Sequence, residues 1–320
     1  MSHRSTLIGV GTYLPERIVS NTELAERVDT SDQWIRERTG IAQRHLAAPH
    51  ETAAFMATAA ARAALRHAEI DPGEVDAILL ATSTPDQAFP ATAVRVQAAL
   101  GLTRGFAFDL SAACSGFIYA LSVADSLIRT GQVRTVLVIG AEVFSRLLDW
   151  SDRATCVLFG DGAGAVVLRA GPADGRGILS THLHSEGSTG DLLYVDGAIG
   201  RPETSGFLRM NGREIFRHAV AKLAGAVDEA LAANGLGYDD VDWLVPHQAN
   251  KRIIDAMGKK LGLPPERVVV TVDRHANTSA ASIPLAFAEA VHDGRIGAGD
   301  LVLMEALGGG LTWGSALLRM

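Results

Sequence analysis

A cysteine between a predicted strand and a predicted helix is the strongest candidate for nucleophilic chemistry in this chain. Cys114 lies in FDLSAACSGFIYAL, and the apolar residues after it recur at three- and four-residue spacing, which predicts a helix that starts near Cys114 and ends at Gly131. Unpaired N–H groups at the amino end of a helix favour a thiolate and could lower the thiol pKa from about 8.5 to roughly 3.5–7.5. The alternative is a small core residue, because free cysteine is often buried.

Three later segments could supply the other groups of a cysteine-based site. His247 follows the apolar run DWLV at the end of a predicted strand, where an imidazole could be a hydrogen-bond donor, a base or a structural loop residue. Asn277 is predicted to lie between a strand and a helix, so it could be a donor, a turn former or an N-cap. Gly308, Gly309 and Gly310 separate two apolar runs and could aim an N–H at a substrate oxygen or make a tight turn.

Three other patterns are weaker candidates. Cys156 lies in TCVLF, a continuous apolar run that predicts a strand, so we expect an inert core thiol. The glycine-rich FGDGAGAVVL from Phe159 has no following helix and predicts strand, turn and strand rather than a phosphate-binding loop. His182 and His184 alternate on one predicted strand face, which could suit a metal, but no carboxylate or thiolate pattern accompanies them. We therefore expect neither a metal nor a redox cofactor.

A duplicated α/β plan must position these residues. The segments around DAILLATST and FDLSAACSGFIYAL have counterparts about 165 residues later, around DWLVPHQAN and VDRHANTSAASIPLAF. Each half is predicted to follow the order βαβαβαββ, with residues 1–172 in the first half and 173–320 in the second. Strands alternating with helices predict mainly parallel sheets covered by helices. Because ligands bind at the carboxyl ends of such strands, Cys114, His247 and Asn277 are expected to converge.

Composition narrows the class of protein. The 320 residues are 48% apolar and 20% charged, and no apolar run reaches the roughly 18 residues of a membrane span, so a soluble protein without membrane insertion is expected. The first residues show no secretory signal, and two cysteines are too few for a disulfide framework, which favours the cytoplasm. The net charge of −7 does not predict the overall positive charge that is typical of nucleic-acid-binding proteins. An acidic partner would need a local basic patch.

Five motifs carry a resemblance to a known family, namely AACSGF, FGDGAGA, VPHQAN, RHANTSAASIP and GGGLTWGSAL. They resemble β-ketoacyl-[acyl-carrier-protein] synthase III, the priming condensing enzyme of bacterial fatty acid synthesis, over essentially the whole chain. The resemblance implies a thiolase-like fold, with duplicated halves in a five-layered α/β/α/β/α arrangement, and a homodimer. It also implies transfer of a short acyl group from acyl-CoA and decarboxylative condensation with malonyl-[acyl-carrier-protein]. CoA thioesters would be substrates, and no cofactor is expected.

The resemblance implies roles for residues that match the family motifs. Cys114 would be the acylated nucleophile, and His247 and Asn277 would complete a Cys-His-Asn set. An asparagine in place of the second histidine of elongating enzymes favours a primer from acyl-CoA. The residues expected to contact CoA are Trp34, Arg38 and Arg153. The residues expected at the acyl pocket are Phe89, supplied by the partner subunit, Leu192 and Met210.

Four basic residues resemble the family's docking patch for the acidic carrier protein, namely Arg217, Arg252, Lys259 and Lys260. In a net-negative chain such a patch would steer and orient the partner, and the alternative is four solvated helix-surface residues. Arg217 stands where the family often has lysine. Leu307 stands where phenylalanine often precedes the three glycines. Both departures leave the chemistry intact and bear on affinity and pocket shape.

Two other functions stay open at this point. A thiolase-fold synthase of secondary metabolism, of the polyketide or quinolone type, would use the same cysteine with other acyl donors. A non-catalytic acyl-binding module would keep the fold without turnover, although the intact Cys-His-Asn set argues against it. The sequence leaves the length and branching of the primer undetermined.

Overall fold

The computed structural model describes residues 3–197 and 206–320, and its first sheet is built from strands of the first half. β4 pairs in parallel with β5 and β6, while β7 runs antiparallel between β6 and β1. All residues of β4 and β6 are buried, as expected of strands with helices on both faces of the sheet. In sheet order the strands are β1 Arg4–Tyr13, β7 Asp161–Gly171, β6 Thr135–Val143, β4 Ala77–Ala81 and β5 Phe106–Leu110.

The second sheet repeats this plan with four strands. β11 and β12 are parallel, and β13 runs antiparallel between β12 and β8. In sheet order the strands are β11 Trp243–Pro246, β12 Leu301–Gly308, β13 Thr312–Arg319 and β8 Gly177–Ser185. The chain passes from the first sheet to the second between Gly171 and Gly177. The division into residues 1–172 and 173–320 remains a prediction.

The prediction of a strand immediately before Asn277 is wrong, so the second half departs from the order βαβαβαββ. A single bridge at Val268 pairs with β11, and the short helix α8, Val272–His275, directly precedes Asn277. The buried side chain of Gln248 explains the difference, because its Oε1 accepts the N–H of Thr271 at 2.8 Å. Backbone groups that a strand would have paired are satisfied by this side chain instead.

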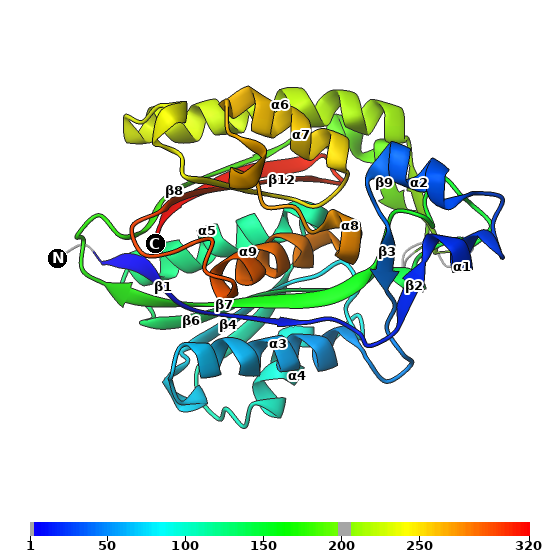
Figure 1. Ribbon diagram of the computed structural model, residues 1–320. Coiled ribbons are helices and arrows are strands. Elements are labelled where there is room, and N and C mark those ends of the chain that lie inside the picture. Colours follow the sequence, from blue (N-terminus) through cyan, green and yellow to red (C-terminus); the bar gives the residue numbers. More distant parts are fainter. Residues whose placement is uncertain (1–2, 198–205) are drawn as a thin grey trace.

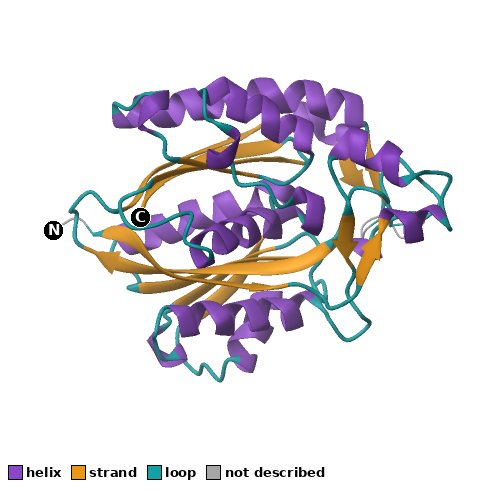
Figure 2. Ribbon diagram, in the orientation of Figure 1, coloured by secondary structure: helices purple, strands orange, loops and turns teal. Residues whose placement is uncertain are grey.

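Helices complete a five-layered arrangement (Figure 1, Figure 2). α6 and α7 form one outer layer, α3 and α4 form the other, and α5 and α9 lie between the two sheets. This confirms the α/β/α/β/α architecture that the resemblance implies. The helices are α3 Ala53–His67, α4 Thr92–Ala99, α5 Gly116–Arg129, α6 Gly212–Asn234, α7 Lys251–Leu261 and α9 Ser282–His292.

The middle layer joins both halves into one core. Phe117 of α5 and Phe287 of α9 are fully buried in the same apolar cluster, which also contains residues of both sheets. Gly140 of β6 permits a close approach, because a Cβ there would lie 2.2 Å from the backbone oxygen of Ala280. The first sheet therefore contacts the turn that precedes α9. No helix in the described part of the chain is long and apolar enough to cross a membrane.

Small elements gather at one end of the layers, on the right in Figure 1. β2 pairs with β3 and β9 pairs with β10, both antiparallel, and α1 and α2 connect β2 to β3. These elements are β2 Ile18–Ser20, α1 Asn21–Ala25, α2 Asp32–Thr39, β3 Gln43–His45, β9 Leu193–Val195 and β10 Leu208–Met210. Of these elements, α2, β9 and β10 supply residues to the cavity that His247 and Leu307 of the second half also line.

Two segments differ from their predicted structure. Cys156 lies in a turn rather than a strand, because its N–H donates to the backbone oxygen of Asp152 at 3.0 Å. Its side chain is nevertheless fully buried, as a core thiol should be. The glycine-rich segment from Phe159 continues into one strand, β7, without an intervening turn. Gly164 lets α9 pack on that strand, since a Cβ there would lie 2.7 Å from the N of Leu285.

Candidate active site

Cys114, His247 and Asn277 line one cavity of about 570 Å³. The cysteine comes from the first half and the other two residues from the second half, so the convergence expected from the duplicated plan occurs. A second cavity, of about 350 Å³, adjoins the first at Cys114 and has an apolar wall that includes Phe144 and Phe159. A thioester could therefore reach the sulfur from the larger cavity and place its acyl group in the smaller one.

Cys114 occupies the amino end of a helix, as predicted. It lies in a 3₁₀ turn, Ala113–Ser115, that leads directly into α5. Ala113 has a φ of 46°, in the left-handed region that residues with a Cβ rarely adopt, and such strain often accompanies functional sites. The hydroxyl of Ser115 donates to Thr312 Oγ1 at 2.8 Å, and Thr312 donates to a backbone oxygen beside the turn. The start of β13 therefore holds the turn that carries the sulfur.

The thiol of Cys114 is neutral in the free chain. Cys114 is 4% exposed, and burial raises its pKa to about 12, although a hydrogen bond with Ser279 lowers it in part. The prediction that the helix end lowers this pKa below its usual value is therefore wrong for the free chain. Desolvation of the charged form outweighs the helix terminus, so loss of the proton must accompany attack on a substrate.

Gly308 lets the end of β12 lie directly against the nucleophile. A Cβ at this position would lie 2.5 Å from the N of Cys114 and 3.1 Å from the N of Ser115, so any side chain would displace the turn. Gly309 and Gly310 line the smaller cavity beside the sulfur. The three glycines thus lie where a backbone N–H could reach an oxyanion formed at Cys114. That role remains a prediction.

His247 directly follows β11, and a buried serine contacts its ring. His247 Nδ1 lies 2.6 Å from Ser282 Oγ. Burial lowers the pKa of His247 to about 3, so the imidazole is neutral near pH 7. Nε2 has no hydrogen-bond partner among the described residues, and the ring lines the larger cavity. A neutral imidazole with one free nitrogen suits hydrogen bonding to a substrate.

Asn277 presents its amide to the same cavity. Its Oδ1 accepts the N–H of Ser279 at 2.9 Å, which leaves the Nδ2 donor group without a partner in the described structure. Its backbone pairs with the first half of the chain, because its N–H donates to Leu158 and its oxygen accepts from Gly160. Asn277 is therefore both a turn former, as the alternative interpretation held, and a donor directed to the cavity. It is not the N-cap of α9, which is Ala281.

Two buried glutamates near the site were not anticipated. The carboxylate of Glu142 accepts the N–H of Ser83 and the hydroxyl of Ser279, and burial raises its pKa to about 7. Burial raises the pKa of Glu305 to about 8, and neither of its side-chain oxygens has a partner within the described residues. A charged residue inside each apolar run, TVLVIGAEV and LVLMEALG, was the signal that could have found them.

The residues expected to contact CoA come together beside the larger cavity. The guanidinium carbon of Arg38 lies 4.8 Å from the Trp34 ring centroid, and that of Arg153 lies 5.3 Å from it. Trp34 and Arg38 line the cavity, as does Arg213, which carried no motif and was missed. Arg153 also donates to the backbone oxygen of Asp29 at 2.8 Å. An indole flanked by guanidinium groups suits a nucleotide base and its phosphates, and contact with CoA remains a prediction.

The residues expected at the acyl pocket have different locations. Met210 lines the larger cavity. Leu192 lines neither cavity, because it packs against the core cluster of the second sheet, whereas its neighbour Leu193 lines both. Phe89 is 84% exposed and also lines neither. Its contribution to the pocket of a partner subunit remains a prediction.

Two stacked aromatic rings form part of the wall of the smaller cavity. The ring centroids of Phe144 and Phe159 lie 5.0 Å apart with an interplanar angle of 20°, and both residues are buried. Sequence reasoning missed them as pocket residues, because a buried aromatic residue in an apolar run is indistinguishable from an ordinary core residue. They bring large apolar side chains to the space beside Cys114.

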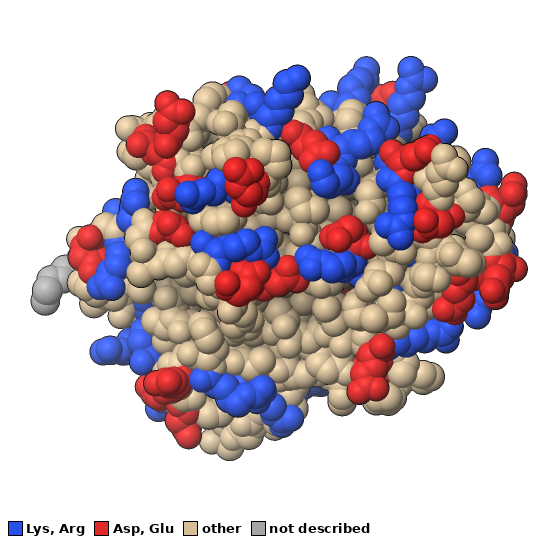
Figure 3. Space-filling view, viewed as in Figure 1, with Lys and Arg blue, Asp and Glu red and all other residues tan. Residues whose placement is uncertain are grey.

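The four residues of the expected docking patch lie on two neighbouring helices but at different ends of them. Arg217 is near the start of α6, and Arg252, near the start of α7, lines the larger cavity. Lys259 and Lys260 lie at the other end of α7, about 12 Å along the helix, and Lys260 is 3.3 Å from Asp228. Figure 3 shows basic and acidic groups interspersed over the α6 and α7 side. Carrier-protein docking remains a prediction.

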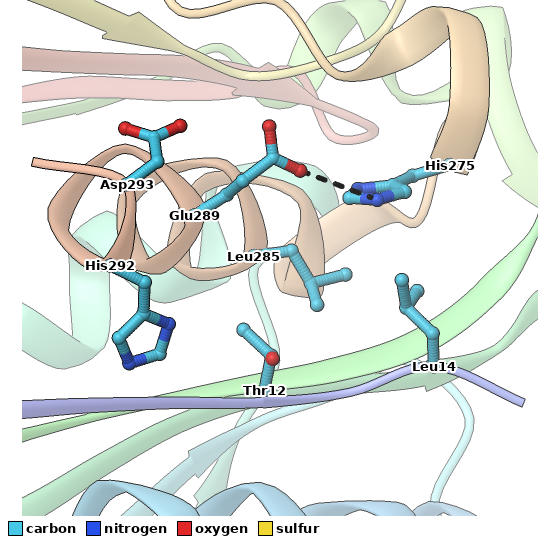
Figure 4. A pocket seen from close by; sticks show the side chains of 7 residues that line it. All are labelled: Thr12, Leu14, His275, Leu285, Glu289, His292 and Asp293. Carbon is cyan, nitrogen blue, oxygen red and sulfur yellow. Dashed lines mark ion pairs between the residues drawn. The ribbon is translucent and has the colours of Figure 1, made fainter. Parts of the chain in front are cut away.

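Other titratable clusters lie apart from Cys114. A third cavity, of about 300 Å³, contains a contact of 3.8 Å between the carboxylate of Glu289 and the imidazole of His275 (Figure 4), and burial lowers the pKa of His275 to about 3, so this ring is neutral near pH 7. It is lined by Thr12, Leu14, His275, Leu285, Glu289, His292 and Asp293. His182 and His184 both pair with Glu229, at 3.3 and 2.6 Å. Within residues 3–197 and 206–320, no group of three or more histidine, cysteine or acidic residues could hold a metal ion.

Known proteins resemble the chain throughout its length. The family 3-oxoacyl-[acyl-carrier-protein] synthase III matches residues 108–187, and its C-terminal part matches residues 231–320. The β-ketoacyl-[acyl-carrier-protein] synthase III of Acidiphilium cryptum is 72% identical over 317 residues, which cover 99% of each chain. The crystal structure of 3-oxoacyl-[acyl-carrier-protein] synthase III from Aquifex aeolicus is 50% identical, covers 99% of this chain and 100% of that chain, and has a TM-score of 0.94.

A solved structure from polyketide biosynthesis is also similar. The priming β-ketosynthase of the R1128 polyketide pathway is 39% identical, covers 100% of this chain and 97% of its own, and has a TM-score of 0.94. The solved relatives share the five-layered architecture of the thiolase-like fold, which confirms the predicted fold class. On sequence identity over the full length, the chain belongs to the 3-oxoacyl-[acyl-carrier-protein] synthase III family.

Proposed function

We propose that this chain is a priming condensing enzyme of fatty acid synthesis. It takes a short acyl group from acyl-CoA onto Cys114 and joins it to malonyl-[acyl-carrier-protein] with loss of CO2, giving 3-oxoacyl-[acyl-carrier-protein] and CoA. The observation that carries the proposal is the single cavity that joins the sulfur of Cys114, the neutral imidazole of His247 and the amide of Asn277. Membership of the family supports the choice of acyl donor and acceptor.

In the first half-reaction, the sulfur of Cys114 attacks the thioester carbonyl of acyl-CoA. Because burial holds the resting thiol neutral, its proton is lost as the new C–S bond forms. The oxyanion accepts the N–H of Cys114 and one N–H from the loop Gly308–Gly310, both fixed before the reaction. The bond from the carbonyl carbon to the CoA sulfur then breaks, and that sulfur takes up a proton, so CoA departs as the free thiol. CoA leaves, with its adenine near Trp34, and the acyl group remains in the smaller cavity.

In the second half-reaction, malonyl-[acyl-carrier-protein] takes the place of CoA in the larger cavity. His247 and Asn277 donate hydrogen bonds to its thioester oxygen and stabilise the enolate that forms as CO2 departs. The carbanion then attacks the carbonyl carbon of the acyl group on Cys114, the bond from that carbon to the sulfur breaks, and the sulfur takes up a proton to restore the thiol. Both donors are neutral and buried, so they stabilise a charge that develops only during the reaction. These steps need no metal or redox cofactor.

A homodimer would complete the acyl pocket. Phe106 lies in β5, the edge strand of the first sheet, and is 41% exposed, while Phe89 is 84% exposed. Exposed aromatic residues beside an open sheet edge suit pairing with a second copy, whose Phe89 would reach the pocket. The carrier protein would approach Arg252 at the larger cavity. The two free cysteines are compatible with the reducing cytoplasm as the site of action.

The nucleophile assignment is tested by intact mass after incubation with acetyl-CoA. The wild-type chain should gain one acetyl group, and Cys114→Ala should gain none. Cys156→Ser is the matched control and should acetylate like the wild type, because that thiol is fully buried and lines neither cavity at Cys114. An undiminished acetyl adduct on Cys114→Ala would reject the assignment.

The role of Asn277 is tested separately. Asn277→Ala should still accept an acetyl group, because its amide acts in the second half-reaction. It should lose about 10²–10³-fold in the rate of malonyl decarboxylation, the usual effect of removing one donor to a developing negative charge. Release of labelled CO2 from malonyl-[acyl-carrier-protein] measures this rate. Decarboxylation at the wild-type rate would exclude the proposed role.

Priming of a polyketide pathway is the second candidate, supported by the similarity to the R1128 enzyme. Product analysis with malonyl groups on a fatty-acid carrier protein, on a polyketide carrier protein and on CoA separates the two. A strong preference for the fatty-acid carrier protein supports our proposal. Acyl binding without any turnover would instead indicate a non-catalytic acyl-binding module.

A further inference from the structure

The hydroxyl of Ser282 contacts the ring of His247, and the other hydrogen bonds of this hydroxyl limit which atom carries the proton between them. Ser282 is the first residue of α9 and is 2% exposed. Its Oγ lies 2.6 Å from His247 Nδ1, and the backbone N–H of Gln248 donates to the same oxygen at 3.3 Å. The described structure offers the hydroxyl no third partner.

The count decides which ring nitrogen carries the proton. A serine hydroxyl has one proton to donate and two lone pairs that accept. The N–H of Gln248 can only donate, so it uses one lone pair of Ser282 Oγ. If His247 Nδ1 also carried a proton, the hydroxyl would accept twice, and its own proton would have no acceptor inside a buried site. An unsatisfied buried donor is disfavoured, so the hydroxyl proton belongs on the bond to Nδ1.

The opposite nitrogen must then carry the imidazole proton. A neutral imidazole has one protonated and one unprotonated nitrogen, and burial keeps this ring neutral. Nε2 makes no hydrogen bond within the described residues, and His247 lines the cavity that contains Cys114. The geometry therefore places an N–H donor on the cavity side of the ring.

We propose that Ser282 is a positioning residue that donates its hydroxyl proton to His247 Nδ1, fixes the Nε2–H tautomer and so makes His247 a hydrogen-bond donor in the cavity. The action of this donor on a thioester oxygen rests on the proposed function. The assignment of the tautomer does not depend on that function. An Nε2–H group cannot accept the Cys114 proton, so His247 is not the base for the first half-reaction in this state.

The side-chain amide of Asn277 also presents a hydrogen-bond donor to the cavity. Asn277 Oδ1 is occupied by the N–H of Ser279, so its Nδ2 group remains to donate. The hydroxyl of Ser279 is in turn anchored on Glu142 at 3.1 Å. Two donor groups thus line the same cavity, as stabilisation of one negatively charged oxygen requires.

The tautomer is tested by NMR of the free protein labelled with ¹⁵N in its ten histidines. His247 is identified by the signals that vanish in His247→Gln. The proposal expects, at pH 7, a downfield Nδ1 of the unprotonated type and a protonated Nε2. Ser282→Thr, which keeps the hydroxyl, should preserve this pattern, and Ser282→Ala should shift Nδ1 toward a tautomer mixture. A protonated Nδ1 in the wild-type protein, as either the other tautomer or an imidazolium, overturns the proposal.

Kinetics test the consequence for the second half-reaction. Ser282→Ala should accept an acetyl group from acetyl-CoA within about twofold of the wild-type rate. It should decarboxylate malonyl-[acyl-carrier-protein] about 10- to 100-fold more slowly, the range found when the hydrogen-bond partner that orients a metal-bound histidine is removed. Ser282→Thr should recover most of that loss. Ser315→Ala is the matched control, because Ser315 is also fully buried and its hydroxyl donates to a backbone oxygen of α6 at 2.9 Å.

The outcomes separate this inference from the proposed function. If the wild-type chain shows no acyl transfer, the proposed function fails while the NMR result still decides the tautomer. If Ser282→Ala keeps both the wild-type His247 spectrum and the wild-type decarboxylation rate, the inference fails while the function stands. If Ser282→Ala does not fold, the NMR spectrum of the wild-type protein and the spectrum and kinetics of Ser282→Thr decide whether the inference holds.

Discussion

Replacing Glu142 with glutamine should remove one pH dependence of stability from this protein. Glu142 is fully buried in β6 and forms no ion pair among the described residues. Its carboxylate accepts hydrogen bonds from Ser83, Thr82, Thr84 and Ser279, but burial still raises its pKa from 4.5 to about 7. The folded chain therefore holds this proton more tightly than the unfolded chain.

The sign and size of the effect follow from this pKa. An acid whose pKa is raised by folding contributes stability that is fully present below its unfolded pKa and is lost as the pH rises through its folded pKa. The difference between 4.5 and about 7 corresponds to about 3 kcal/mol in the free energy of unfolding. Relative to Glu142→Gln, the wild-type protein should lose about this amount between roughly pH 4 and roughly pH 8.

Urea unfolding at a series of pH values measures the effect, at one fixed protein concentration because a homodimer is proposed. Glu305, whose pKa burial raises to about 8, is present in both proteins, so its contribution cancels in the difference. Glu74→Gln is the matched control, since it removes an exposed carboxylate that pairs with Arg169. Parallel stability curves for the wild type and Glu142→Gln would refute the reasoning that Glu142 is a buried, proton-binding carboxylate.

Three further changes have defined outcomes. Gly308→Ala should destabilise the protein by about 1–3 kcal/mol in thermal unfolding and slow the acylation of Cys114, because the new Cβ would lie 2.5 Å from the N of Cys114. Gly225→Ala is the control and should do neither, because no atom lies within 4 Å of a Cβ at that position. Trp34→Ala should raise KM for acyl-CoA about 5- to 150-fold in steady-state assays with little change in kcat, because base stacking is lost; an unchanged KM would argue against adenine contact. Phe144→Ala should shift primer preference toward longer acyl-CoAs in competition assays by enlarging the smaller cavity, and an unchanged preference would place the acyl chain elsewhere.

The local parts of the site could be predicted from the sequence. The helix after Cys114, the turn at the three glycines and the strand before His247 follow from periodicity and from residue type, which depend on neighbours along the chain. The duplication also predicted that both halves contribute to one cavity. The five-layered architecture came instead from the resemblance of whole motifs to a known family.

Long-range contacts decided other features that the local pattern of the sequence does not show. The strand expected before Asn277 gave way to a short helix because the side chain of Gln248 satisfies that backbone. Leu192 packs into the core, so that its neighbour faces the cavities. Lys260 pairs with an acidic residue of α6 at the far end of α7 from Arg252. None of these partners is close in sequence.

The sequence by itself determined which side chains are present and which local element carries each one, because helix and strand patterns depend on residues a few positions apart. Only the tertiary structure decided their chemical state. Burial between two sheets makes Cys114 a neutral thiol, keeps Glu142 close to its protonation midpoint at neutral pH, and brings Ser282 onto the ring of His247. The physical reason is that desolvation and hydrogen bonding depend on every atom packed around a group, and most of those atoms come from distant parts of the chain.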